Sequence, residues 1–109
     1  MTNKGTSTFI AQRASAVVLL PLAVWFLWSA ASHAGASYEE VRAWLSAPAG
    51  ALPMGLLILV GALHMRIGLN EIIDDYVDSG TRGLFKLLNL FASLGAAALG
   101  VWALFSLSV

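Results

Sequence analysis

Three side chains in the segment 64–76 have the right chemistry for metal ligation and proton transfer. His64 lies near the end of an uncharged stretch over residues 43–65, and the pair Asp75 and Tyr76 follows eleven residues later. An imidazole within an apolar helix suits ligation of a metal or a haem iron, whereas an acid beside a phenol near the water boundary suits proton-coupled work on a small molecule. At about 100° per residue, this spacing exceeds three full helical turns by about 20° and spans about 16 Å of the axis. We therefore expect His64 and Asp75 to lie on one face of the same helix.

Each of these residues also has a purely structural explanation. A lone histidine in an apolar helix is often a hydrogen-bonded interior residue, but a polar group at the centre of a bilayer needs a strong reason, which favours ligation by His64. An acidic helix end followed by an interfacial tyrosine is common at membrane surfaces. The local pattern alone therefore favours the structural explanation for Asp75 and Tyr76.

The composition predicts an all-α membrane protein. Hydrophobic residues make up 59% of the chain and charged residues 11%. Soluble domains are roughly half apolar and roughly one-quarter charged, so this chain is more apolar and less charged than they are. Three uncharged runs each exceed the roughly 20 residues that a helix needs to cross the hydrocarbon core: 14–38, 43–65 and 87–109. The first run is too long for the apolar region of a signal peptide, so we expect it to be retained.

We expect a single transmembrane domain over residues 1–109, with three helices at about 12–35, 48–76 and 83–108. Pro21 is expected to kink the first helix. Residues 35–42 are expected to form the loop between the first two helices, and turn signals between Val77 and Gly83 to mark the second connection.

The distribution of basic residues predicts the orientation in the membrane. Cytoplasmic segments carry an excess of Lys and Arg, and acidic residues contribute little to this signal. The first connection carries only Arg42. The other five basic residues lie in or near the N-terminal tail and the second connection: Lys4, Arg13, Arg66, Arg82 and Lys86. We therefore expect a cytoplasmic N-terminus and a C-terminus on the opposite side.

Several classes of function are disfavoured by the composition. The net charge is zero, so nothing indicates binding to nucleic acid. The chain has no cysteine, which excludes disulfides and cysteine-ligated iron-sulfur clusters within it. It also lacks a glycine-rich phosphate loop, a nucleophile elbow and an HExxH motif. Most redox cofactors that the chain meets must therefore belong to partners.

The neighbours of His64 fit a haem ligand, although they have alternative roles. Gly61 and Gly68 flank it at i−3 and i+4, where absent side chains would let a flat macrocycle approach the helix. Arg66 is expected either to pair with a haem propionate or an acid, or to extend its long side chain to the membrane surface. His33 is predicted at the outer interface, about 15 Å from the midplane, and so cannot share a haem with a mid-bilayer His64. Because a six-coordinate haem needs two axial ligands, the second should come from another subunit.

The third hydrophobic run has small residues at helical spacing. Ala92, Ala96 and Gly100 recur every four residues, which permits close helix contact in lipid. This pattern fits either assembly with another subunit or packing among the three helices of the chain. In both cases three helices are too few to enclose a haem and a quinone.

Two motifs resemble those of a known family. The first helix is expected to begin with the segment RASAVVL at residues 13–19, and His64 is followed by Ile67-Gly68 and then by DDYV at residues 74–77. Together they resemble the small membrane-anchor subunit of bacterial succinate dehydrogenase, respiratory complex II. The resemblance covers nearly the whole chain, and the spaced His, Gly and Asp-Tyr motif is its specific part.

The resemblance implies roles for individual residues. His64 would be an axial ligand of haem b, opposite a histidine from the larger cytochrome b anchor subunit. Tyr76 would hydrogen-bond a carbonyl of ubiquinone on the cytoplasmic side, and Asp75 would support a proton path. Arg13 matches an arginine near the haem propionates and the quinone pocket, where Arg66 and Gly68 are further candidates for contacts. The contact by Arg66 is our own hypothesis, because positions 66, 70 and 71 differ from the pattern of some relatives.

The resemblance also implies partners and a location. The chain would form half of a heterodimeric cytochrome b anchor in the bacterial cytoplasmic (inner) membrane, with a periplasmic C-terminus. An iron-sulfur subunit and a flavoprotein subunit would dock on the cytoplasmic face and pass electrons from succinate oxidation to quinone. The chain by itself would have no catalytic residue and no dehydrogenase activity.

Two other functions fit parts of the pattern. The chain could anchor a fumarate reductase, because the direction of the reaction depends on the quinone and on the partner subunits. A small transporter or assembly protein could instead use His64, Arg66 and Asp75 as a buried proton or ion relay. That function would leave the eleven-residue spacing unexplained.

Overall fold

The computed structural model describes residues 4–109, which form four helices and no strand. The helices are α1 (Lys4–Ser32), α2 (Tyr38–Ser46), α3 (Pro48–Tyr76) and α4 (Ser79–Leu107). Each of the three long helices has 29 residues, a length of about 44 Å that exceeds the roughly 30 Å of the hydrocarbon core. All three are apolar enough to cross a membrane. These findings confirm the predicted all-α membrane protein.

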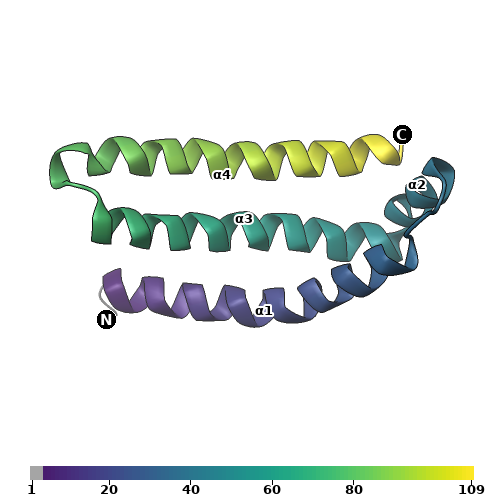
Figure 1. Ribbon diagram of the computed structural model, residues 1–109, viewed down its shortest axis with the longest axis horizontal. Coiled ribbons are helices and arrows are strands. Elements are labelled where there is room, and N and C mark those ends of the chain that lie inside the picture. Colours follow the sequence, from purple (N-terminus) through teal and green to yellow (C-terminus); the bar gives the residue numbers. More distant parts are fainter. Residues whose placement is uncertain (1–3) are drawn as a thin grey trace.

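The long helix α3 runs antiparallel to α1 and α4 and lies between them (Figure 1). α3 contacts both neighbours, whereas α1 and α4 make no contact with each other in the described part of the chain. The short α2 packs against the ends of α3 and α4. α3 is therefore the central helix, and functional residues on it can be contacted from two sides within the chain.

The helix α2 corrects the expectation of a loop over residues 35–42. Gly35 turns the chain with a φ of +78°, and Ser37 then caps the new helix by accepting a hydrogen bond from the backbone N–H of Glu40 at 3.2 Å. Glu39 and Glu40 lie in the first turn, where acidic side chains are stabilised by the helix dipole. This serine, followed three residues later by a glutamate, is a capping signature that the sequence already contained.

The ends of the long helices also differ from the predicted ends. α1 begins at Lys4 instead of near residue 12, and α4 begins at Ser79 instead of near residue 83. Polar helical turns therefore precede the apolar part of each span. Residues 1–3 and the side chain of Lys4, one of the basic residues behind the predicted orientation, lie outside what the structure describes. Figure 1 shows α1 curving along its length, and Pro21 lies within it, where the missing N–H leaves one carbonyl without its helical partner.

The few buried side chains are mostly polar. Among the described residues no large side chain is fully buried, and Ile73 is the one hydrophobic residue in the core, at 9% exposure. Ser15, Asn89 and Ser93 are only 4–5% exposed. Small and polar residues thus mediate contacts between the helices, as is common in lipid, while the large apolar side chains face outward. Lipid or other membrane-embedded protein must cover these outward faces.

The end of the molecule that contains α2 is held by polar and aromatic contacts. Arg42 donates from Nε to the carbonyl of Leu107 at 2.9 Å, and the hydroxyl of Ser46 donates to the same carbonyl. His33 stacks on the indole of Trp44 with a centroid distance of 4.1 Å. The one basic residue of the first connection therefore satisfies carbonyls at the end of α4, which have no partner within the helix.

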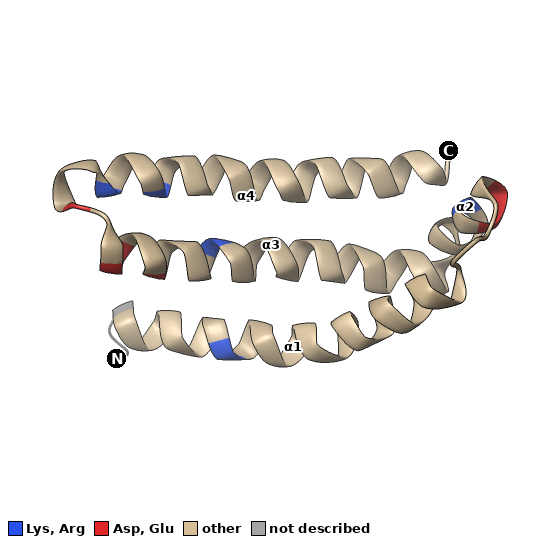
Figure 2. Ribbon diagram, in the orientation of Figure 1, with Lys and Arg blue, Asp and Glu red and all other residues tan. Residues whose placement is uncertain are grey.

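The acidic residues lie at the two ends of the molecule, whereas basic residues also lie farther inward on α1 and α3 (Figure 2). Most of the Lys and Arg residues lie toward the end with the α3–α4 connection, whereas Arg42 lies in α2 at the other end. This separation is the one expected of a membrane protein with a single basic side. That the basic side faces the cytoplasm stays a prediction.

Candidate functional site

His64 lies near the middle of α3 and is held by α1. Its Nδ1 is 2.7 Å from the hydroxyl oxygen of Ser15, which is 5% exposed. The same hydroxyl donates to the backbone carbonyl of Gln12 at 3.0 Å. The second ring nitrogen of His64, Nε2, has no hydrogen-bond partner among the described residues. One nitrogen of the imidazole is thus occupied by the protein, and the other is free to bind a ligand.

The two glycines beside His64 have different surroundings. A Cβ atom added at Gly68 would lie 3.5 Å from the side-chain nitrogen of Gln12, so this glycine packs against α1. A Cβ atom added at Gly61 would meet nothing within 4 Å. Gly61 is therefore the flanking position with open space beside it within this chain.

The histidine fits a single ligand of a haem iron better than part of a complete metal site. No group of three His, Cys, Asp or Glu residues that could hold a metal ion occurs in the described part of the chain. A haem, in contrast, needs only one or two axial ligands from the protein because the porphyrin supplies the others. The free Nε2 of His64 therefore suits an axial bond to haem, with any second axial ligand supplied from outside this chain.

Asp75 and Tyr76 end α3 and face outward. Tyr76 is 84% exposed, Asp75 is also exposed, and neither side chain has a polar partner among the described residues. Because α3 is continuous from Pro48 to Tyr76, the eleven residues from His64 to Asp75 place both on one face, about 16 Å apart along the axis. The chain thus presents an acid and a phenol at the end of the helix that carries the histidine.

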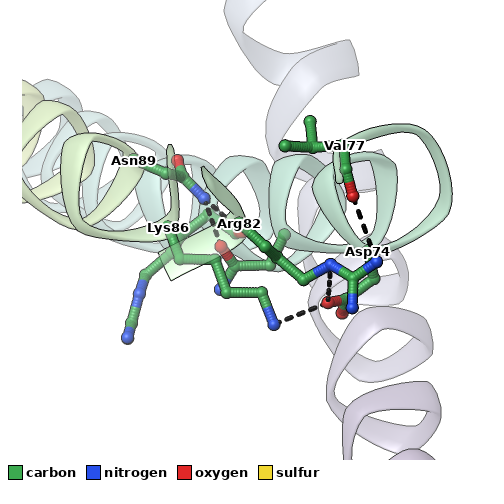
Figure 3. Close-up of polar contacts among 7 residues, drawn as sticks. Asp74, Val77, Arg82, Lys86 and Asn89 are labelled. Atoms are coloured by element: carbon green, nitrogen blue, oxygen red, sulfur yellow. Dashed lines mark hydrogen bonds and ion pairs between the residues drawn. The ribbon is translucent and has the colours of Figure 1, made fainter. Parts of the chain in front are cut away.

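The neighbouring acid, Asp74, behaves differently. Asp74 forms an ion pair with the ammonium of Lys86 at 2.7 Å and a longer one with Nε of Arg82 at 3.8 Å. Both basic residues of α4 therefore point toward Asp74 (Figure 3). Arg82 also donates from Nη2 to the carbonyl of Val77 at 3.1 Å. These side chains are more than one-third exposed, so each ion pair contributes only about 0–1 kcal/mol. Of the two adjacent aspartates, Asp74 joins α3 to α4 and Asp75 is left available.

A cleft of about 610 Å³ opens beside Asp74 at this end of the molecule. α1 contributes Gly5 and Thr8, and α4 contributes Lys86. α3 contributes the rest of the lining: Arg66, Ile67, Asn70, Glu71 and Asp74. Arg66 therefore lies with the cleft, and its guanidinium has no ion-pair partner among the described residues. Neither Asp75 nor Tyr76 lines this cleft.

Arg13 is exposed on α1, two residues before the serine that contacts His64. Its guanidinium lies over the ring of Phe9 at 5.1 Å, a cation-π contact within the same helix. The structure brings Arg13 into no polar contact with His64, Asp75 or Tyr76 among the described residues. Its predicted role near a haem propionate or a quinone therefore requires groups from outside the chain.

A buried polar network fixes α4 against α3 behind the cleft. The side-chain amide of Asn89 donates to the carbonyl of Arg66 and to Asn70 Oδ1, both at 2.9 Å (Figure 3). The hydroxyl of Ser93 donates to Asn89 Oδ1 at 3.2 Å. No single sequence motif indicated this network. An asparagine ten residues inside an apolar helix was the available signal, because an amide there needs partners.

Replacing Asn89 with leucine is expected to loosen the contact between α3 and α4. The change removes three hydrogen bonds and leaves the amide of Asn70 and the hydroxyl of Ser93 without this partner. Hydrogen bonds between helices in lipid contribute about 0.6 kcal/mol on average, so we expect a loss of about 1–2 kcal/mol. Thermal unfolding of the detergent-purified protein measures this loss. Ser93→Ala removes one of the three bonds and should give a smaller decrease, and equal stability of Asn89→Leu and wild type would contradict the assigned role.

Comparison with known proteins identifies the family. A sequence profile described as the succinate dehydrogenase/fumarate reductase transmembrane subunit matches residues 1–99. The chain belongs to this family. It is also 32% identical over 102 residues to the succinate dehydrogenase hydrophobic membrane anchor subunit of Paracoccus denitrificans, and this match covers 94% of the chain and 79% of the relative. No solved structure shows a significant match.

Membership of the succinate dehydrogenase/fumarate reductase transmembrane subunit family confirms the resemblance noted in the two sequence motifs. Family membership and the three spanning helices together show that the chain is a multi-pass membrane protein. A location in a bacterial inner membrane is consistent with both findings. It also favours an enzyme anchor over a transporter. The relay of the transporter alternative is not assembled, because His64 contacts Ser15 and neither Arg66 nor Asp75 among the described residues.

Proposed function

We propose that this anchor contributes His64 as one axial ligand of haem b and uses Tyr76 and Asp75 at a site where ubiquinone is reduced. The observation that carries the first part is the engagement of one imidazole nitrogen by Ser15, which leaves the other nitrogen available. When bound, the haem would supply one-electron redox chemistry within the anchor. A larger cytochrome b subunit would provide the opposing ligand, because the described residues place no second histidine beside His64.

The exposed end of α3 supports the second part of the proposal. Reduction of a quinone to a quinol consumes two electrons and two protons, and negative charge develops on the carbonyl oxygens. The phenol of Tyr76 can donate a hydrogen bond to such an oxygen, and Asp75 can take up and deliver protons at the membrane surface. Both side chains lack partners in this chain among the described residues, so they are available to a site completed by other subunits.

The arrangement also suggests how the enzyme assembles. The charged end of α3 and α4 would face the cytoplasm and receive an iron-sulfur subunit, which accepts electrons from a flavoprotein subunit that oxidises succinate. The outward apolar faces of the three helices would contact the larger anchor subunit and lipid. In this assembly the chain binds and orients groups and holds protons, while the partner subunits supply the dehydrogenase chemistry.

Purification of the native complex through a tag on this chain tests the proposal. We expect a flavoprotein, an iron-sulfur protein and a second membrane subunit to co-purify, with succinate-dependent ubiquinone reduction and a b-type reduced-minus-oxidised spectrum. Purification of the chain without a flavoprotein would contradict the anchor function. A complex that reduces quinone but has no haem would remove only the role of His64.

An anchor of a fumarate reductase is the second candidate, because the family description covers both enzymes. The co-purified quinone separates the two directions. Ubiquinone would support succinate oxidation, and a quinone of low potential would support fumarate reduction.

A further inference from the structure

The serine that contacts His64 occupies an unusual position for a polar side chain. Ser15 lies in the apolar helix α1, is 5% exposed, and bridges to the central helix α3. In the sequence, Ser15 belongs to the RASAVVL segment at residues 13–19. The hydroxyl makes two short contacts, 3.0 Å to the carbonyl of Gln12 and 2.7 Å to His64 Nδ1.

The position of the proton in each contact follows from the chemistry of the groups. A carbonyl oxygen only accepts, so in the contact with Gln12 the hydroxyl of Ser15 is the donor. The lone pairs of the serine oxygen can at the same time accept a hydrogen bond from His64. A metal-ligating imidazole bonds through a nitrogen lone pair, so when Nε2 is the ligating atom, Nδ1 carries the proton and donates it to Ser15.

We propose that Ser15 is a positioning residue that holds His64 in the Nδ1–H tautomer, aims Nε2 at the haem iron and tunes the haem's redox potential. This inference rests on the proposed function, because it requires His64 to be an axial ligand. A hydrogen bond from the distal N–H of a metal-bound imidazole fixes the ring and makes the ligating nitrogen more basic. A more basic ligand stabilises the oxidised iron and lowers the midpoint potential.

The surroundings leave few substitutes for this hydroxyl. Gln12 is one polar side chain that could compete, because its Oε1 is buried and has no hydrogen-bond partner in the described part of the chain. Gly68 lies beside the amide nitrogen of Gln12, so this side chain packs close to the turn after His64. Removal of the serine oxygen should therefore alter the histidine directly, with Gln12 as the residue to inspect for compensation.

Redox titration of the haem in the complete purified complex tests the proposal with a matched pair of variants. Ser15→Val and Ser15→Thr have nearly the same shape, but only threonine keeps a hydroxyl. We expect Ser15→Val and Ser15→Ala to raise the midpoint potential and to weaken haem retention about tenfold, the lower end of the range for such outer partners. Ser15→Thr should retain the wild-type potential and the wild-type spectrum of the oxidised haem. Ser93→Ala, which removes a buried hydroxyl from α4, should leave the potential unchanged.

The other possible results of the redox titration would overturn the role of Ser15 or the haem role of His64. A wild-type potential in Ser15→Val and Ser15→Ala would overturn the inference while leaving His64 as the ligand. The same shift in Ser15→Thr and Ser15→Val would also overturn it, because the hydroxyl would then not be the cause. If the alanine variant does not assemble, the comparison of valine with threonine decides. A wild-type complex without haem b would remove the haem part of the proposed function and this inference together.

Discussion

Replacing His64 with alanine is expected to abolish or change the b-type haem signal of the complex. The substitution removes the only imidazole near the middle of α3 and leaves the iron with at most one protein ligand. Removing a residue that only hydrogen-bonds a metal ligand weakens metal binding by roughly 10- to 100-fold. The loss of haem affinity in His64→Ala should be larger, because a direct bond to the iron is lost. A reduced-minus-oxidised visible spectrum of the purified complex measures the result. Weaker absorbance, or a spectrum of altered ligation, is the expected outcome.

The second histidine of the chain provides the matched control. His33 lies at the other end of the molecule, stacks on Trp44 and donates from Nδ1 to the carbonyl of Ser29 at 2.7 Å. His33→Ala should therefore leave the haem spectrum unchanged, although it removes the same side chain. A normal spectrum in His64→Ala, or an equal loss in both variants, would show that His64 is not the ligand.

Replacing Tyr76 with phenylalanine is expected to impair quinone reduction without affecting succinate oxidation. The change keeps the ring and removes only the hydroxyl that would donate to a quinone carbonyl. A hydrogen bond to developing charge contributes about 1.5–3 kcal/mol, so ubiquinone reduction should fall by about tenfold to a hundredfold. Electron transfer from succinate to an artificial acceptor, which bypasses the quinone, should keep its wild-type rate. The haem spectrum should also be unchanged, since Tyr76 lies about 18 Å from His64 along α3.

The other tyrosine and the neighbouring aspartates make this test specific. Tyr38 is exposed in α2 at the opposite end, so Tyr38→Phe should leave quinone reduction unchanged. Asp75→Asn should slow quinone reduction by removing a proton carrier, whereas Asp74→Asn should mainly weaken the ion pair with Lys86. Wild-type quinone turnover in Tyr76→Phe, or an equal defect in Tyr38→Phe, would contradict the assignment.

The different surroundings of Asp74 and Asp75 show that spacing along one helix does not predict contacts with a second helix. The sequence correctly placed Asp75 on the face of His64, because a helix of known pitch determines which residues share a face. It could not reveal that Lys86 and Arg82 return along α4 to engage the adjacent acid, since this depends on how the second connection turns. The same limit applies to Asn89, whose partners at Arg66 and Asn70 lie on a different helix.

The sequence by itself determined the class of protein, the three spans and the family motif, whereas the haem and quinone roles of His64, Asp75 and Tyr76 stay predictions. These properties are local: hydrophobic length decides whether a helix crosses the bilayer, and helical pitch decides which side chains align. Only the tertiary structure decided that α3 is central and that Ser15 contacts His64. A contact across 49 residues depends on the rotation and depth at which α1 packs on α3. Most large apolar residues of this chain face outward, so a few small and polar side chains set the rotation and depth of α1 on α3. The hydrophobic pattern of the sequence does not reveal these contacts.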